Sequence, residues 1–408
     1  MRVETQKARA ATAFRLIAAA ARIRAPRGNA GVTRVLLRST SNGDFVNFLP
    51  FLAQSMLEQP DGRTLLVELS RMGPVAAQFL RGLQPTIDTL DATSACRMWE
   101  GLKIPLSRLR GQRPAEVMYV GHSGDSPRAR ALKLLLCRTL AGASAPVRGF
   151  GYFPALDSLP APTTGASRWT RHQALVPFHR ASESIRISRS SLLRFLAPTE
   201  DELSNVDSII RSFSIAGVPP PIGVYVGSRV SRKRWPLERW RSLITALQAD
   251  GFPIVLLGGA EDEPTNQAML CMIAQRACSA AAQTTLRESI WLSQRLGLVI
   301  ANDGAAAHLA ALAGTPVVSI FCNWEPAGAW EPVLAPSSRS IRPVWSLRDA
   351  TKDEYGISSI PVPPVLAAAR ALLDGGSGHS VITVTADGMR HEESIAGFPF
   401  VPSEPSVP

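Results

Sequence analysis

The chain has 408 residues, of which 45% are hydrophobic and 19% are charged. This length exceeds that of one ordinary domain, so two or three domains are expected. No segment approaches the roughly 18 consecutive apolar residues of a membrane-spanning helix, which argues against a helical integral membrane protein. The five cysteines form no C-x-x-C pair, which argues against a disulfide framework or a cysteine-rich zinc site. We therefore expect a cytoplasmic protein.

The positive charge is concentrated at the N-terminus. The formal net charge is +11, and residues 1–31 contain seven Lys or Arg against one Glu. Ala10, Phe14, Ile17 and Ala21 recur there at helical spacing, which predicts a basic helix or extension. Such a helix could lie on the anionic surface of the inner membrane, and a loosely docked terminal helix explains the pattern equally well. The overall charge indicates an acidic partner, and anionic lipid, phosphorylated glycan, nucleotide and nucleic acid all fit.

The first half shows an α/β pattern. Strands are expected at 32–37, 64–69, 116–120 and 147–150, with helices at 45–56 and 129–140. Strands that alternate with helices indicate a parallel sheet, so residues 32–211 are expected to form an N-terminal Rossmann-like domain. Residues 151–211 are rich in Pro, Ser and Arg in their first part and give no clear pattern.

The α/β pattern restarts after a linker expected at 212–221, which ends in three prolines. Residues 222–375 are expected to form a second Rossmann-like domain, and residues 376–408 are polar and expected to be a disordered tail. The expected strands are 222–226, 253–257, 297–300 and 316–321, and the expected helices are 237–249, 264–277, 287–295, 306–313 and 363–373.

The turn after the first expected strand reads Ser39-Thr40-Ser41-Asn42-Gly43-Asp44. Ligands bind at the carboxyl ends of strands in open α/β sheets, so an acid there has two interpretations. Asp44 could cap the following helix, which is the commoner role of aspartate in this position. Alternatively, it could accept the proton of a substrate hydroxyl.

A basic loop, Gly227–Pro236, follows the expected strand 222–226 and contains four cations and two serines. Cations beside hydroxyls at a strand end suit a diphosphate. A solvated basic loop or a nucleic-acid patch fits the charge as well. Trp235 and Trp240 argue against an ordinary flexible loop.

Two further segments follow strand ends. Ile300–His308 joins a strand to a small-residue helix, whose N-terminal N–H groups suit an anion. Asp303 there could equally be a cap, and His308 could be a packing residue. Glu261 and its acidic neighbours follow the Gly258-Gly259 turn, where they could bind ribose hydroxyls or simply decorate a first helical turn.

Together these segments resemble the family-nine glycosyltransferases, which include the heptosyltransferases of the lipopolysaccharide core. The resemblance runs from about residue 32 to residue 332 and is weak between 151 and 215. It is carried by S-x-G-D…L-P (Ser41 to Pro50), K-R-W-P-x-x-x-W (Lys233 to Trp240), L-L-G-G-A-E (Leu256 to Glu261) and D-x-x-x-x-H (Asp303 to His308).

This resemblance implies the GT-B fold, with two Rossmann-like domains facing each other across a cleft. It implies an inverting, metal-independent glycosyltransferase that moves heptose from ADP-heptose onto a lipopolysaccharide-core or related anionic glycan. No cofactor and no nucleic-acid partner are implied. Asp44 would be the general base, and Arg38, Ser41 and Gly43 would lie on the acceptor or phosphate side. The implied donor-binding residues are Ser228, Arg229, Lys233, Glu261, Asp303, Gly304 and His308.

The sequence departs from the family in one block. The family pattern is D-S/T-G-x-x-H, whereas here Gly304 directly follows Asp303 and no hydroxyl is present. Two alternatives therefore stay open, namely a nucleotide-sugar epimerase on the same fold and a non-catalytic protein that binds a nucleotide or an anionic surface.

Overall fold

The structure is a computed structural model. It describes residues 34–39, 42–58, 60–68, 79–80, 87–91, 114–121, 137–138, 141, 145, 147–148, 186–212, 219–273, 276–322, 330–343, 356–384, 390–395, 397–398 and 400. These residues fall into two compact units, one up to Arg186 and the other from Ile187 onward. The predicted basic helix at 1–31 lies outside the described residues.

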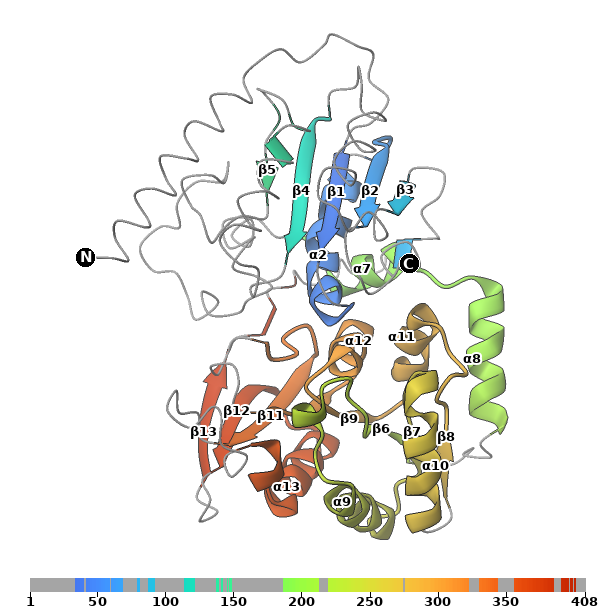
Figure 1. The fold of residues 1–408 in the computed structure, drawn as a ribbon, viewed down its shortest axis with the longest axis vertical. Helices are drawn as coiled ribbons and strands as arrows, with labels where there is room; N and C mark the ends of the chain where they lie inside the picture. Colours follow the sequence, from blue (N-terminus) through green and yellow to red (C-terminus); the bar gives the residue numbers. More distant parts are fainter. Residues whose placement is uncertain are drawn as a thin grey trace, which may run out of the picture. The chain divides into compact units, whose positions relative to one another are not determined.

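The first unit is built on a parallel sheet (Figure 1). Within the described residues it has five strands in the order β3-β2-β1-β4-β5, which is a Rossmann-like order. The strands are β1 (Arg34–Ser39), β2 (Thr64–Glu68), β3 (Ile87–Asp91), β4 (Glu116–Gly121) and β5 (Val147–Arg148). Helix α2 (Asn42–Glu58) follows β1, as the sequence predicted.

A buried ion pair joins the first residues of the central strands. Arg34 lies opposite Thr64 on one side and Glu116 on the other. Its guanidinium donates to Glu116 Oε1 at 2.5 Å and to the backbone oxygen of Ser55 at 2.7 Å. Because these buried charges have hydrogen-bonding partners, they fix the register of β1, β2 and β4 and the position of α2.

The second unit contains eight described strands in the order β13-β12-β11-β10-β9-β6-β7-β8. All pairs are parallel except β12 with β13. The strands are β6 (Ile222–Tyr225), β7 (Ile254–Leu256), β8 (Ala277–Ser279), β9 (Leu298–Asn302), β10 (Val317–Ile320), β11 (Ser337–Pro343), β12 (Gly378–Val384) and β13 (Arg390–Ile395).

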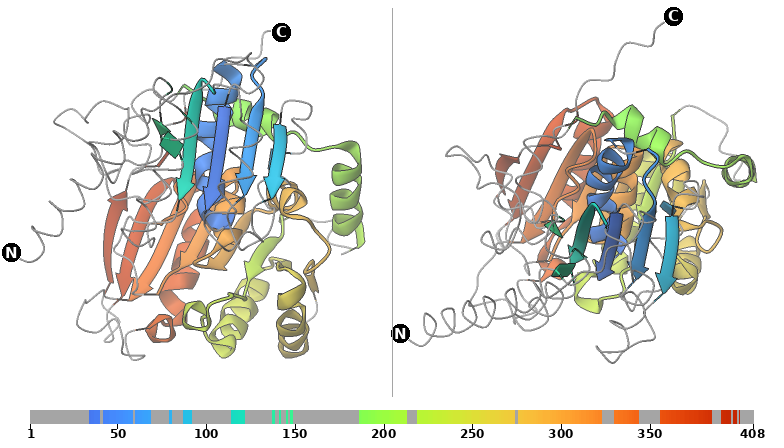
Figure 2. Two further views of the ribbon diagram at one scale, coloured as in Figure 1. Left: turned by 45° about the horizontal axis from the view of Figure 1, so that its top comes forward. Right: turned by 90° about the horizontal axis from the view of Figure 1, so that it is seen from above.

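Helices pack around this sheet in two groups (Figure 2). The first contains α9 (Leu237–Ala249), α10 (Glu263–Met272) and α13 (Val362–Leu373). The second contains α8 (Glu200–Ser212), α11 (Leu286–Gln294) and α12 (Ala305–Ala313). The short helix α7 (Arg189–Phe195) precedes them. The predicted helices at 237–249, 287–295, 306–313 and 363–373 are confirmed within one residue at each end.

Helices α7 and α8 pack on the second unit, although the expected boundary assigns them to the N-terminal domain. Arg287 on α11 donates to Glu202 on α8 at 2.8 Å, and Asn205 on α8 donates to Glu288 on α11 at 3.0 Å. The first part of the expected linker lies outside the described residues, and β6 starts at Ile222 as predicted.

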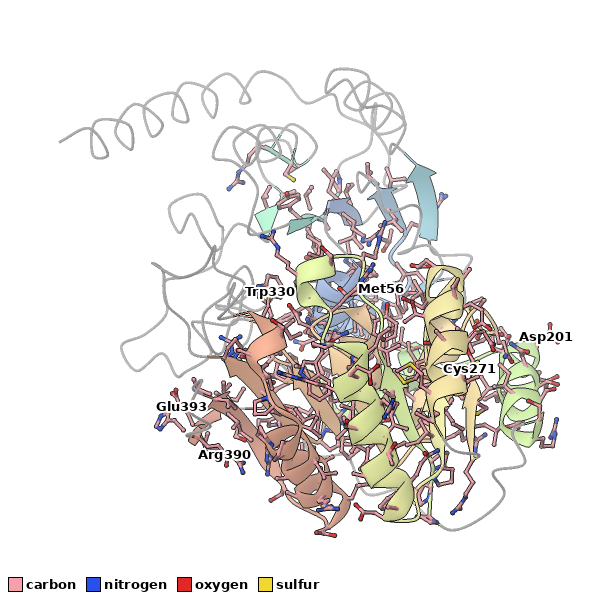
Figure 3. All side chains as sticks on the ribbon, turned by 60° about the horizontal axis from the view of Figure 1, so that its bottom comes forward. Met56, Asp201, Cys271, Trp330, Arg390 and Glu393 are labelled. Carbon is pink, nitrogen blue, oxygen red and sulfur yellow. The ribbon has the colours of Figure 1, made fainter. Side chains whose placement is uncertain are left out.

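The prediction of a disordered tail from residue 376 is wrong for residues 378–384 and 390–395. They form β12 and β13, and Figure 3 shows Arg390 and Glu393 on the exposed outer strand. The tail was misread because the first four residues of β13 are Arg, His, Glu and Glu, which resemble a solvated loop. Strand β11 was missed because it is rich in serine and lacks the apolar pattern of a buried strand. Its serines are nevertheless buried, and the Ser340 hydroxyl forms a 2.9 Å hydrogen bond with the Ser319 hydroxyl.

A partly buried histidine at the start of β12, His379, makes stability depend on pH. Burial, with contributions from Arg339 and Arg189, lowers the pKa of His379 to about 4. The unfolded chain therefore binds the proton more readily between pH 6.5 and pH 4, and stability present above pH 6.5 is lost as the pH falls. Urea unfolding of His379→Gln should show a weaker decline over this range than the wild type. His391→Gln, at an exposed site on β13, is the matched control and should keep the wild-type decline.

No helix among the described residues is long and apolar enough to cross a membrane.

Candidate functional site

The candidate site lies where the strand order of the second sheet reverses. From β6 the chain proceeds to β7 and β8 on one side, and from β9 it proceeds to β10 and β11 on the other. Ligands of open α/β sheets bind outside the carboxyl ends of the strands at such a reversal. Strands β6 and β9 are direct neighbours, with Tyr225 opposite Ala301. Consequently, the basic loop after β6 and the Asp303 block after β9 emerge side by side.

The basic loop is held at both ends. A short 3₁₀ turn, η4 (Ser231–Lys233), interrupts it, and Arg234 Nε donates to the backbone oxygen of Ser228 at 2.6 Å. The loop ends at Trp235, which is 1% exposed and donates from Nε1 to the Ile360 oxygen at 2.8 Å. The Trp235 ring also meets that of Trp240 edge to face, at 5.1 Å between centroids. The tryptophans thus anchor the loop, as their presence in the sequence suggested.

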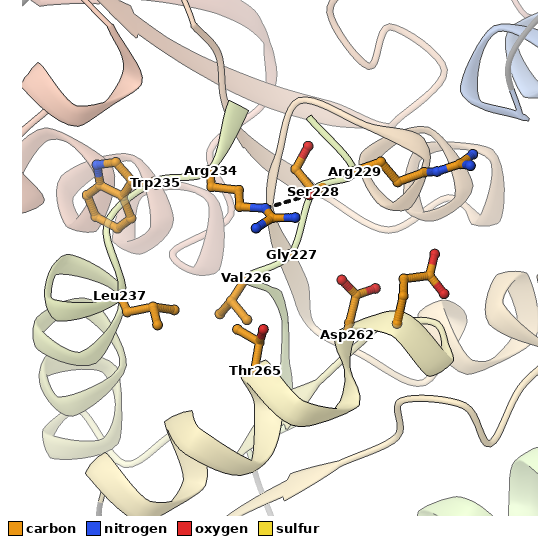
Figure 4. Close-up of a pocket in the computed structure, with 10 residues that line it drawn as sticks. Val226, Gly227, Ser228, Arg229, Arg234, Trp235, Leu237, Asp262 and Thr265 are labelled. Atoms are coloured by element: carbon orange, nitrogen blue, oxygen red, sulfur yellow. Dashed lines mark hydrogen bonds between the residues drawn. The ribbon is translucent and has the colours of Figure 1, made fainter. Parts of the chain in front are cut away.

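A pocket of about 600 Å³ opens beside this loop (Figure 4). Its lining combines the loop, the start of α9 and the turn before α10, and consists of Val226, Gly227, Ser228, Arg229, Arg234, Trp235, Leu237, Glu261, Asp262 and Thr265. Arg229 and Arg234 contribute cations, whereas Glu261 and Asp262 contribute carboxylates from the 3₁₀ turn η5 (Ala260–Asp262). The pocket therefore offers both anion-binding groups and acceptors for hydroxyl groups.

Asp262 forms the tightly packed wall of the pocket. Its carboxylate accepts a hydrogen bond from the Gly259 N–H at 2.9 Å, and the Tyr225 hydroxyl donates to it as well. Burial raises the pKa of the Asp262 carboxyl. A Cβ on Gly227 would lie 1.9 Å from Asp262 Oδ1, and one on Gly258 would lie 2.6 Å from Asp262 Cβ. A side chain at position 258 would therefore collide with the Asp262 Cβ, and one at position 227 would displace the Asp262 carboxylate.

An ion pair connects the basic loop with the block after β9. Lys233 Nζ contacts Asp303 Oδ2, with 24% and 10% of the two side chains exposed. The Asp303 N–H donates to the Ile320 oxygen at 2.8 Å, which fixes the backbone at this point. Helix α12 begins two residues later, and no side chain caps its N-terminus. Its free N–H groups and dipole favour an anion near Lys233.

The other two predicted residues of the block after β9, Gly304 and His308, belong to the start of α12. Gly304 occupies the N-cap position of α12, and His308 lies one turn into the helix with 4% of its surface exposed. The structure thus gathers Ser228, Arg229 and Glu261 at the pocket, and it joins Lys233 to Asp303 beside the start of α12.

Position 304 has room for a serine or threonine side chain, which the family-nine pattern has after the aspartate. Its backbone is extended, with φ of 173°, and an added Cβ would find its nearest neighbour, the Asn302 oxygen, at 3.8 Å. Gly304→Ser should therefore fit, and at the expected donor site its hydroxyl should donate to the bound anion and tighten nucleotide binding about 2- to 10-fold, the range expected for one added hydrogen bond. Gly304→Ala adds the Cβ without the hydroxyl and should show no gain. Equal affinities of the two variants in a calorimetric titration would contradict this prediction.

The predicted residues of the N-terminal domain are described in part. Gly43 and Asp44 lie in the first turn of α2, although nothing is described of the Asp44 side chain, and Ser41 lies outside the described residues. Arg38 on β1 is fully buried, with its guanidinium 5.2 Å from the centre of the Phe45 ring. Its packing beneath α2 supports the helix that carries Asp44.

Asn302, Asp262 and Arg234 lie in segments that the sequence singles out, but none of the three was assigned a role of its own, although each shapes the site. The signal for Asn302 is its position as a polar residue at the end of the apolar strand β9. The roles of Asp262 and Arg234 arise from contacts across the loops, and spacing in the sequence does not reveal them. Within the described ranges, no cluster of three or more His, Cys, Asp or Glu side chains could hold a metal ion.

Comparison with known proteins confirms the resemblance inferred from the motifs. Residues 197–354 match the model of glycosyltransferase family 9 (heptosyltransferase). The chain is 28% identical over 172 residues to lipopolysaccharide heptosyltransferase 2 of Escherichia coli, covering 40% of this chain and 49% of that protein. It is also 28% identical over 134 residues to lipooligosaccharide heptosyltransferase 2 of Haemophilus influenzae, covering 32% and 38%. These matches thus span half or less of the length of the curated relatives.

Solved structures extend the similarity to the fold. A family 9 glycosyl transferase from Veillonella parvula superposes with a TM-score of 0.62 at 19% identity, covering 85% of this chain and 100% of that one. The ADP-heptose heptosyltransferase II of Escherichia coli gives 0.54 at 18% identity, covering 84% and 99%. The expected GT-B class of fold is confirmed.

Proposed function

We propose that this chain, whose residues 197–354 match glycosyltransferase family 9, transfers heptose from ADP-heptose to a lipopolysaccharide-core or related anionic glycan. The observation that carries the proposal is the arrangement at the strand-order reversal. There a Lys233–Asp303 ion pair adjoins the uncapped start of α12 and a pocket lined by both cations and carboxylates. A nucleotide diphosphate linked to a sugar presents the complementary groups, namely phosphate oxygens and hydroxyls.

The donor would be bound through its charge and its hydroxyls. Lys233, the Ser228 hydroxyl and the N-terminus of α12 would hold the diphosphate, while Glu261 would accept from the ribose. Asp303 and His308 would contact the sugar or the phosphates. In the free protein the ion pair with Asp303 already holds the Lys233 ammonium in place. A bound diphosphate would contact this ammonium group together with Asp303. Pre-oriented cations reduce the entropy lost on binding.

Transfer would proceed by single displacement. Asp44 would accept the proton of the acceptor hydroxyl as its oxygen attacks the anomeric carbon, and the bond from that carbon to the diphosphate oxygen would break. Attack from the face opposite the leaving ADP inverts the configuration at this carbon. The negative charge that develops on the diphosphate would be stabilised by Lys233 and the α12 dipole, without a metal ion.

The acceptor is proposed to be an anionic, lipid-linked glycan, and the protein is proposed to work in the cytoplasm at the inner membrane. The net charge of +11 and the basic segment 1–31 support this proposal. Anionic lipid attracts such a segment with about 1 kcal/mol per basic residue near the surface.

The test is a transfer assay with ADP-heptose and lipopolysaccharide that lacks its core heptoses, with and without EDTA. The proposal expects ADP release together with a mass increase of one heptose on the acceptor, both insensitive to EDTA. Isomerised sugar in a reaction without acceptor would instead identify an epimerase. Donor binding without turnover on any core acceptor would identify a binding protein.

A further inference from the structure

One buried side chain, which was not assigned a role from the sequence, forms hydrogen bonds with both ends of the basic loop. Asn302 is the last residue of β9 and is completely buried. Its Nδ2 donates to the backbone oxygens of Val226 and Gly227, both at 3.0 Å, and its Oδ1 accepts from the Trp235 N–H at 3.2 Å. One amide group therefore joins Val226 and Gly227, at the start of the loop, to Trp235 near its end.

The loop between these attachment points contains the proposed donor-binding groups. Ser228 and Arg229 follow directly after Gly227, and Lys233 precedes Trp235 by two residues. Because both ends of the loop are bonded to the same side chain, their separation is fixed by the dimensions of an amide. Asn302 is also covalently joined to Asp303, the partner of Lys233. The loop is thus fastened to the β9 block by three hydrogen bonds at its base and by an ion pair near its tip.

We infer that Asn302 is a positioning residue, which sets the affinity for a nucleoside diphosphate by holding the basic loop in its binding conformation without touching the ligand. The inference rests on the proposed function for its link to the donor, but the hydrogen bonds themselves do not depend on that function. The requirement is specific for asparagine at this site, because the group must both donate twice and accept once within a buried space.

Two substitutions test this role. Asn302→Asp keeps the shape and an acceptor for Trp235, but it replaces the two donated hydrogen bonds by a carboxylate facing two carbonyl oxygens. Asn302→Ala removes all three hydrogen bonds without burying a charge. If the aspartate variant fails to fold, the alanine variant alone tests whether Asn302 positions the loop. The matched control is Thr315→Val, which deletes a buried 2.7 Å hydrogen bond to the Ser293 oxygen just before β10, at the opposite end of the same sheet.

The first measurement is amide hydrogen exchange of a peptide covering residues 227–235. We expect exchange at least about tenfold faster in both Asn302 variants, beginning with the Trp235 amide in Asn302→Ala, and no change in this peptide in Thr315→Val. Unchanged exchange in a folded Asn302→Ala would overturn the inference, whatever ligand the protein binds.

The second measurement is the dissociation constant for ADP at a temperature where all variants are folded. An increase of about tenfold or more is expected for the Asn302 variants, and Thr315→Val should stay within about twofold of the wild type. Faster exchange combined with wild-type affinity would overturn the link to ligand binding. A wild-type protein that binds no ADP would contradict the proposed function instead, and the exchange measurement would still decide whether Asn302 fixes the loop.

Discussion

Asp44→Asn is expected to abolish sugar transfer while leaving donor binding nearly unchanged. The amide keeps the size of the side chain in the first turn of α2 but cannot accept the proton of the acceptor hydroxyl. A positioned general base typically contributes about 10²- to 10⁴-fold to the rate, so turnover should fall by at least that factor. The measurement is ADP release with acceptor present, together with the dissociation constant of the donor.

The control for this variant lies at the other end of the same helix. Glu58 is exposed at the end of α2, where it accepts from Gln54 at 3.0 Å, and Glu58→Gln removes the same charge far from the proposed acceptor side. It should retain wild-type turnover. Normal turnover of Asp44→Asn would remove the catalytic assignment, and loss of donor binding in that variant would show a structural role in place of a catalytic one.

Lys233→Ala is expected to weaken donor binding about 10- to 150-fold, which corresponds to the roughly 1.5–3 kcal/mol of a hydrogen bond to a charged group. The substitution also leaves the Asp303 carboxylate, 10% exposed, without the partner that neutralises it. An anionic diphosphate would then meet an uncompensated negative charge. Both effects act in the same direction, so this loss should exceed that of any other single cation in the loop.

A charge-matched control separates this local effect from the overall charge. Arg241 on α9 is exposed and pairs with Glu238 at 3.4 Å, so Arg241→Ala also removes one positive charge. Its donor affinity should remain within about twofold of the wild type. If Lys233→Ala keeps wild-type affinity, the lysine has no role at the diphosphate, and the ion pair with Asp303 is structural. Asp303→Asn combined with Lys233→Ala measures the coupling between the two side chains.

The sequence predicts the second domain better than the first. Apolar strands such as β6 and β9 alternate with amphipathic helices, and strand-end motifs fall between them, so the pattern locates Lys233, Glu261 and Asp303 at one edge of a sheet. The contacts that organise this edge are not visible in the sequence. The packing of Asp262 against Gly227 and the bonds of Asn302 to Trp235 join residues about 35 to 70 positions apart.

Strands β11 and β13 were missed because their residues are not the apolar residues by which a strand is usually recognised in a sequence. Strand β11 is buried but rich in serine, because neighbouring hydroxyls such as those of Ser319 and Ser340 satisfy each other. Strand β13 is an exposed edge strand, whose charged side chains resemble those of a loop. The range that contains α7 and most of α8 was placed in the N-terminal domain by its order along the chain, whereas contacts such as the Arg287–Glu202 ion pair join α8 to the second unit.

The most direct test of the proposed donor site is a calorimetric titration of the purified protein with ADP-heptose and with UDP-, GDP- and ADP-hexoses, each with and without EDTA. We expect selective binding of ADP-heptose, which EDTA should leave unchanged and which Lys233→Ala should weaken. Absence of binding by every nucleotide sugar would contradict this expectation, and would mean that the site built from Lys233, Asp303 and the pocket beside them does not bind a sugar donor.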